Sequence, residues 1–136
     1  MVLEEVKQKI YSLCEKINLD TNSHLLPLFS ENSSVFSDGA SIYVDNLKCH
    51  YIIMERGKIN KQYESEKLDD IMYILFESIT FSLASDYELE HRNEHEDSRK
   101  QLWEKQLELL AKIDIKFVDR CKREIDSILK IAPYRD

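Results

Sequence analysis

The sequence predicts an α+β fold in which an N-terminal helix precedes a three-stranded antiparallel β-meander and three further helices. The 136-residue chain contains only two glycines and two prolines, which favours long helices over a turn-rich β-sandwich. Apolar residues recur at helical spacing near both ends of the chain and alternate with polar residues between positions 41 and 63. The length is that of one domain, so we expect residues 1–136 to form a single domain.

The first helix is expected over residues 2–17. Its apolar residues keep helical spacing; they are Leu3, Val6, Ile10, Leu13, Cys14 and Ile17. Residues 18–39 are rich in Asn, Ser, Thr and Asp around an apolar insert at 25–29. This composition predicts a long connection that is held in place by its own apolar residues.

Three segments at 41–45, 50–55 and 59–63 alternate with period two, as half-buried strands do. Asp45-Asn46 supplies a turn between the first two segments, and Arg56-Gly57-Lys58 supplies one between the second and third. The glycine of the second turn is available for the positive φ that a tight hairpin requires. The middle segment is the most apolar, which predicts that it is the central strand.

Three helical patterns follow the predicted meander. Ser65 is expected to cap the first, whose apolar residues are too numerous for a surface helix; they are Leu68, Ile71, Met72, Ile74, Leu75, Phe76, Ile79, Phe81, Leu83 and Tyr87. We therefore expect a long central helix that is packed on both sides. The second pattern begins at Ser98, which forms a capping-box pattern with Gln101, and the third runs from Val118 to Leu129 before Pro133.

Charge and cysteine content exclude several classes of protein. The net charge of −7 is opposite to the clustered excess of Lys and Arg that phosphate-backbone binding needs. The three cysteines, an odd number without a CxxC motif, predict reduced and mostly buried thiols. Because no stretch has the length of a membrane span and the N-terminus lacks a signal pattern, we expect a cytoplasmic protein that binds neither membrane nor nucleic acid.

The most polar part of the chain is the acidic segment, residues 86–97. It contains one basic residue and six acidic ones, which are Asp86, Glu88, Glu90, Glu94, Glu96 and Asp97. A charge run of this kind is usually a solvated helix surface. The alternative is a docking surface that attracts a basic partner. Both interpretations place the six side chains at the surface.

His91 and His95 belong to an HxxEH pattern, in which two histidines would share a helix face beside a Glu that could act as a base near zinc. Such enzymes need a third ligand and a substrate cleft, which the pattern does not supply. The chain also lacks a GxSxG motif and a glycine-rich phosphate loop. We therefore expect no catalytic residue, no metal and no cofactor. A small metal-dependent hydrolase that uses His91 and His95 remains an alternative, as does a generic helical adaptor.

Five segments add a further signal through their order along the chain: YIIMERG at 51–57, LDDIMYILFE at 68–77, ASDYELEHR at 84–92, DSRKQLWEKQ at 97–106 and PYRD at 133–136. Together they resemble the Immunity protein 63 family, whose members are encoded beside bacterial polymorphic toxins, including contact-dependent inhibition toxins. The resemblance implies a small cytosolic α+β protein that binds the toxic domain of its cognate effector and neutralises it. It brings no catalytic residues.

The resemblance gives the acidic segment an expected role. Toxin domains of these systems often act on nucleic acid and are basic, so an acidic antagonist would associate faster and could cover a cationic active site. We therefore expect a basic toxin domain, such as a nuclease, to contact the six acidic residues. Other residues of the matching segments have structural interpretations, since Arg99 and Gln106 suit hydrogen bonds between helices.

Overall fold

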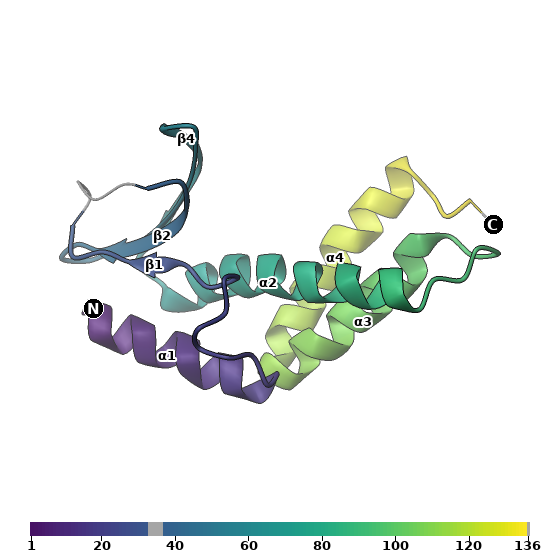
Figure 1. Ribbon diagram of the computed structural model, residues 1–136, viewed down its shortest axis with the longest axis horizontal. Helices are drawn as coiled ribbons and strands as arrows, with labels where there is room; N and C mark the ends of the chain where they lie inside the picture. The colour runs from purple at the N-terminus through teal and green to yellow at the C-terminus, as the bar shows by residue number, and fades with distance from the viewer. Residues whose placement is uncertain (33–36, 136) are drawn as a thin grey trace. The chain divides into compact units, whose positions relative to one another are not determined.

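The computed structural model describes residues 1–32 and 37–135, and within them it contains four helices and a four-stranded mixed sheet (Figure 1). Residues 33–36 of the predicted connection and Asp136 of the last matching segment lie outside the described residues. Contacts within the chain group it into two compact units, residues 1–75 and residues 76–136. The predicted α+β class is confirmed, and the number of strands is corrected below.

Helix α1 (Leu3–Lys16) opens the first unit. The predicted apolar stripe is its buried face, because Val6, Ile10, Leu13 and Cys14 are all buried. Acidic residues occupy its first turn and a lysine occupies its last turn. This distribution complements the helix dipole.

A short parallel strand is the main difference from the predicted sheet. Strand β1 (Leu28–Phe29) lies in the apolar insert and pairs parallel with the first strand of the meander, where Leu28 is opposite Ser41. The backbone N–H of Ser30 extends this pairing by donating to the Ile42 carbonyl at 2.9 Å. Two residues are too few to show an alternating pattern, so the prediction of three strands was wrong by one.

Strands β2 (Gly39–Val44), β3 (Cys49–Glu55) and β4 (Lys58–Ser65) form the predicted antiparallel meander, and the sheet order is β1-β2-β3-β4. Almost all of β3 is buried, which explains why the central segment is the most apolar. The turn after β3 places Arg56 at φ 53° and Gly57 at φ 75°. Two consecutive positive φ values are the requirement of a type I′ hairpin turn.

Helix α2 (Leu68–Glu90) is the predicted long helix and continues from the first unit into the second. Its first half is almost fully buried at Ile71, Met72, Leu75 and Phe76. Ser65 lies three residues before the first residue of this helix, so it is not the N-cap. Its hydroxyl accepts from the N–H of Lys67 and donates to the carboxylate of Asp70 in the first turn.

The apolar stripe of α2 is narrower than predicted. Ile79 is only 2% exposed, whereas Phe81 is 45% exposed and Tyr87 is half-buried. The second half of α2 therefore has an exposed face where the sequence pattern predicts packing on both sides.

Helices α3 (Ser98–Ile113) and α4 (Ile115–Ile131) follow, joined by Asp114 alone. The N-cap of α3 is Asp97, whose side chain accepts from the Arg99 N–H, so the predicted capping box at Ser98 was wrong by one residue. The Arg99 side chain donates to the Ala132 carbonyl at 2.8 Å. The start of α3 therefore lies beside the end of α4, as antiparallel neighbours require.

Gln106 makes the predicted hydrogen bond between helices of the second unit. This side chain is buried, and its Nε2 donates to the Glu77 carbonyl of α2 at 3.0 Å. The Thr80 hydroxyl lies 3.4 Å away and donates to the Phe76 carbonyl. A buried amide with backbone and hydroxyl partners fixes the register of two helices more strictly than apolar contacts do.

The three cysteines are buried thiols, as predicted, at positions 14, 49 and 121. Burial raises the pKa of Cys14 and of Cys49 to about 11, so both stay protonated at neutral pH. Across residues 1–32 and 37–135, no helix is both long enough and apolar enough to span a bilayer.

Replacing two buried side chains of α2 by alanine tests the core and the single-domain expectation together. Leu75→Ala and Ile79→Ala each remove a nearly inaccessible side chain, Leu75 from the first unit and Ile79 from the second. Each should lower the free energy of unfolding by about 2–5 kcal/mol. Because α2 continues through both units, each variant should shift one common transition, measured by circular dichroism and by Trp103 fluorescence. A Leu75→Ala variant that shifts the circular dichroism transition while Trp103 reports the wild-type midpoint would contradict a single cooperative domain.

Candidate functional site

The acidic segment forms the last turn of α2, the connection at 91–97 and the cap of α3. Two of its six carboxylates are paired internally. Glu88 accepts from Nε and Nη2 of Arg92 at 2.9 and 3.0 Å, and Asp97 accepts from Nε and Nη2 of Arg99 at 3.2 and 2.9 Å. Glu88 is 3% exposed and Asp97 is 4% exposed. The expectation that all six acidic residues lie at the surface was therefore wrong for these two.

The pairing changes the protonation of both carboxyls. Hydrogen bonds from Arg92 hold the pKa of Glu88 below its ordinary value. Hydrogen bonds from the Arg99 side chain, and then from the Arg99 backbone, hold the pKa of Asp97 well below its ordinary value. Both groups therefore remain charged under mildly acidic conditions, and each negative charge is balanced by the arginine that binds it.

Arg99 also binds the C-terminal tail. Its Nη1 and Nη2 donate to the carbonyls of Ala132 and Pro133 at 2.8 and 2.9 Å. The backbone N–H of Arg135 donates to the Asp97 carboxylate at 3.2 Å. The Arg99 guanidinium lies 5.5 Å from the ring centroids of Trp103 and Tyr134, within cation–π range. Residues 132–135 are thus held against the start of α3.

The other four acidic residues form the free acidic set, which is Asp86, Glu90, Glu94 and Glu96. The first three are exposed, and Glu96 is partly exposed. Asp86, Glu90 and Glu96 form no ion pair with any residue that the structure describes, and Glu94 interacts electrostatically with Arg92 without a close ion pair. Their negative charge is therefore directed to solvent and is available to a partner.

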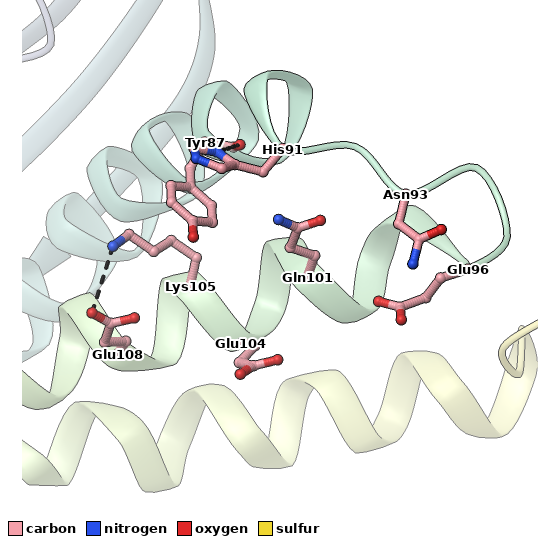
Figure 2. A pocket seen from close by; sticks show the side chains of 8 residues that line it. All are labelled: Tyr87, His91, Asn93, Glu96, Gln101, Glu104, Lys105 and Glu108. Atoms are coloured by element: carbon pink, nitrogen blue, oxygen red, sulfur yellow. Dashed lines mark hydrogen bonds and ion pairs between the residues drawn. The ribbon is translucent and has the colours of Figure 1, made fainter.

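A groove of about 400 Å³ lies beside the free acidic set. Figure 2 shows its lining, which comes from the end of α2, the connection and α3: Tyr87, His91, Asn93, Glu96, Gln101, Glu104, Lys105 and Glu108. The rings of Tyr87 and His91 stack with centroids 4.1 Å apart. Lys105 Nζ lies 4.6 Å from the Tyr87 centroid and 3.5 Å from Glu108. With three glutamates and one lysine, the groove has a net negative charge at neutral pH.

The two histidines of the HxxEH pattern do not share a helix face, because α2 ends at Glu90 and both residues follow it. His91 Nδ1 donates to the Tyr87 carbonyl at 2.9 Å, and His95 lies in the connection. In the described part of the chain, no three His, Cys, Asp or Glu side chains are grouped as metal ligands would be. The helical geometry on which the hydrolase alternative depends is not formed.

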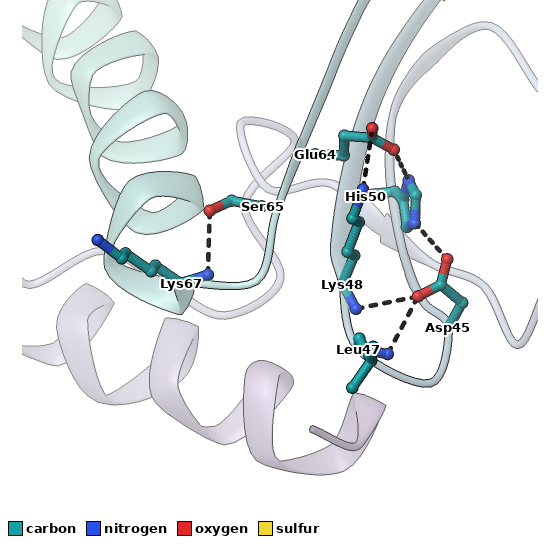
Figure 3. A network of polar contacts seen from close by, with 7 residues as sticks. All are labelled: Asp45, Leu47, Lys48, His50, Glu64, Ser65 and Lys67. Atoms are coloured by element: carbon teal, nitrogen blue, oxygen red, sulfur yellow. Dashed lines mark hydrogen bonds and ion pairs between the residues drawn. The ribbon is translucent and has the colours of Figure 1, made fainter.

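The sheet contains a polar cluster that sequence reasoning missed (Figure 3). His50 is 5% exposed, and its Nε2 lies 2.7 Å from the Asp45 carboxylate while its Nδ1 lies 3.4 Å from the Glu64 carboxylate. Its ring stacks on Tyr43 with centroids 4.4 Å apart. The hydrogen bond from His50 lowers the pKa of Asp45, and burial followed by the two nearby carboxylates raises the pKa of Tyr43.

The register of the sheet explains this cluster. Tyr43 is directly opposite His50, and His50 is directly opposite Glu64. Asp45 also accepts from the backbone N–H groups of Leu47 and Lys48 and so closes the turn between β2 and β3. Alignment of the three predicted strands by their turns could have brought these residues together. The cluster links β2, β3 and β4 through side-chain contacts, which is a structural role.

Comparison with known proteins gives one match. The family model for Immunity protein 63 matches residues 45–127, which is more than half of the chain. The matched range includes β3, β4, the whole acidic segment and α3. No curated protein and no solved structure matches the chain.

Asp97 provides a test of the internal pairing. Asp97→Asn keeps a side chain that can cap α3 but removes the charge that Arg99 binds, so it should lower the free energy of unfolding at pH 7. Because the pKa of Asp97 is lowered by folding, its contribution is present above the ordinary value of 3.8 and is lost as pH falls below it. Denaturant titrations at about pH 7, 5 and 3 should show an equal gap between wild type and variant at the first two values and a smaller gap at the third. A gap that is unchanged at the lowest pH would contradict the assignment.

Proposed function

Because the chain belongs to the Immunity protein 63 family, we propose that it binds the toxic domain of a cognate bacterial polymorphic or contact-dependent inhibition toxin and neutralises it by stoichiometric binding in the cytoplasm. The observation that carries the proposal is the family match over residues 45–127. The net charge of −7 supports a basic toxin domain, for example a nuclease, as the partner.

In this proposal the free acidic set supplies part of the toxin-binding surface. Its carboxylates are at least partly exposed and form no close ion pair within the described residues, so they attract a cationic domain over a distance set by ionic strength. Glu88 and Asp97 act indirectly. Their arginine pairs fix the two ends of the connection that presents Glu94 and Glu96.

Co-expression tests the proposed function. The probe is the C-terminal domain encoded by the toxin gene that neighbours this reading frame, placed under inducible control in a sensitive host. The chain should restore growth and should copurify with the domain at equal molar amounts, because neutralisation by binding is stoichiometric. Growth arrest despite expression of the folded chain would contradict the proposal.

A histidine variant separates binding from the hydrolase alternative. His91→Ala combined with His95→Ala should leave protection within a few-fold of wild type, because neither histidine has the geometry of a metal ligand pair. Loss of protection by a folded double variant whose affinity for the toxin domain is unchanged would favour a catalytic role.

Charge reversal tests the free acidic set. Asp86→Lys, Glu90→Lys and Glu94→Lys together should reduce the association rate with the toxin domain by about tenfold or more at low salt, with a smaller effect at high salt. Glu88 is left unchanged because it is buried against Arg92.

The matched control reverses Glu15, Asp119 and Asp126, which are exposed and lie on other helices. It changes the net charge by the same amount and should retain a larger fraction of the wild-type rate. Equal rates and equal salt slopes for the two triple variants would show that only net charge matters and that the free acidic set has no special role.

A further inference from the structure

The second half of α2 presents an exposed face with an unusual composition. Phe81 is 45% exposed and Leu89 is 62% exposed, and at 3.6 residues per turn they lie on the same side of the helix. The Phe81–Leu89 face comprises these two residues and the exposed or partly exposed serines on the same side of the helix, which are Ser78, Ser82 and Ser85.

The solvent face of a surface helix is normally dominated by charged side chains. Here two large apolar side chains are separated by serines, and both remain exposed to solvent. The nearest basic residue that follows in the chain, Arg92, is bound to Glu88. An exposed aromatic residue and a depletion of charged side chains are features of an interface centre.

Carboxylates of the free acidic set border this face. Asp86 lies at its edge, and Glu90 follows Leu89 directly. We infer that the Phe81–Leu89 face is the apolar centre of the toxin-binding surface and that Asp86 and Glu90 form the adjoining part of its acidic rim. The matching patch on the toxin has large apolar side chains surrounded by Lys and Arg. This inference rests on the proposed function.

The negative charge of the rim favours a cationic toxin patch over two other possible partners, a second copy of the chain and an anionic lipid surface. A second copy of the chain would pair the same patch with itself across a two-fold axis, which would bring acidic rims together. An anionic lipid surface would be repelled by the same carboxylates. A cationic protein patch is the partner whose charge complements the rim.

The arrangement divides the kinetics of binding between two groups of residues. Rim charges act mainly on association, because they steer the encounter before contact. Buried apolar anchors act mainly on dissociation, because their contacts exist only in the bound state. The centre and the rim should therefore be separable by rate measurements.

The test uses Phe81→Ser combined with Leu89→Ser, which extends the serine composition that the face already has. The probe is the catalytically inactive toxin domain encoded by the neighbouring gene, and surface-based kinetics give both rates. Dissociation should become about 30-fold faster or more, the size expected for loss of interface anchors, while association stays within about threefold of wild type. Unchanged dissociation in a folded double variant would overturn the inference and leave the proposed function intact.

The control is Ile115→Ser combined with Ile131→Ser. These side chains are 66% and 88% exposed on α4, so the control removes comparable apolar surface elsewhere in the same unit. It should bind at wild-type rates, and equally fast dissociation of both double variants would overturn the assignment of the centre. If Phe81→Ser impairs folding, Leu89→Ser alone, near the helix end, should still accelerate dissociation. Failure of the wild-type chain to bind the probe would overturn both the inference and the proposed function.

Discussion

Two arginine–carboxylate pairs determine how the second unit presents its surface. At the end of α2, Arg92 forms an ion pair with Glu88. At the start of α3, Arg99 binds both Asp97 and the C-terminal tail. Bidentate pairs of this kind fix orientation as well as distance. The connection between them therefore has two anchored ends, and the positions of the carboxylates that it carries follow from those anchors.

This constraint divides one acidic segment into two functional classes. Glu88 and Asp97 are buried and neutralised, whereas the free acidic set is exposed or partly exposed, with Asp86 and Glu90 beside the Phe81–Leu89 face. An immunity protein must associate before its toxin acts and must then dissociate slowly. In the proposed function, carboxylates at the rim serve the first requirement, and apolar anchors at the centre serve the second.

The helices and the meander could be predicted because each spans enough residues to show its period. Strand β1 could not be predicted, because two residues are too few to show a period and its partner β2 is separated from it by the rest of the connection. Arg92 could be expected to pair with an acidic residue, and Glu88 has the i,i+4 spacing for it, but a count of charges does not show that Glu88 is the buried partner. The bonds from Arg99 agree with the expectation that it bonds between helices, but their acceptors, Ala132 and Pro133, lie more than thirty positions away, and no local pattern specifies them. The exposure of Phe81 likewise depends on where neighbouring helices lie, which an apolar pattern alone does not specify.

The most direct test of the central claim is hydrogen exchange of the chain alone and in complex with the inactive toxin domain. Amides at the end of α2 and in the connection at 91–97 lie at a helix terminus or outside regular secondary structure, so they should exchange faster than the helix interiors in the free chain and more slowly in the complex. Amides of β2–β4 should be unchanged. Protection confined to the sheet, with fast exchange retained at the end of α2 and in the connection, would contradict the account.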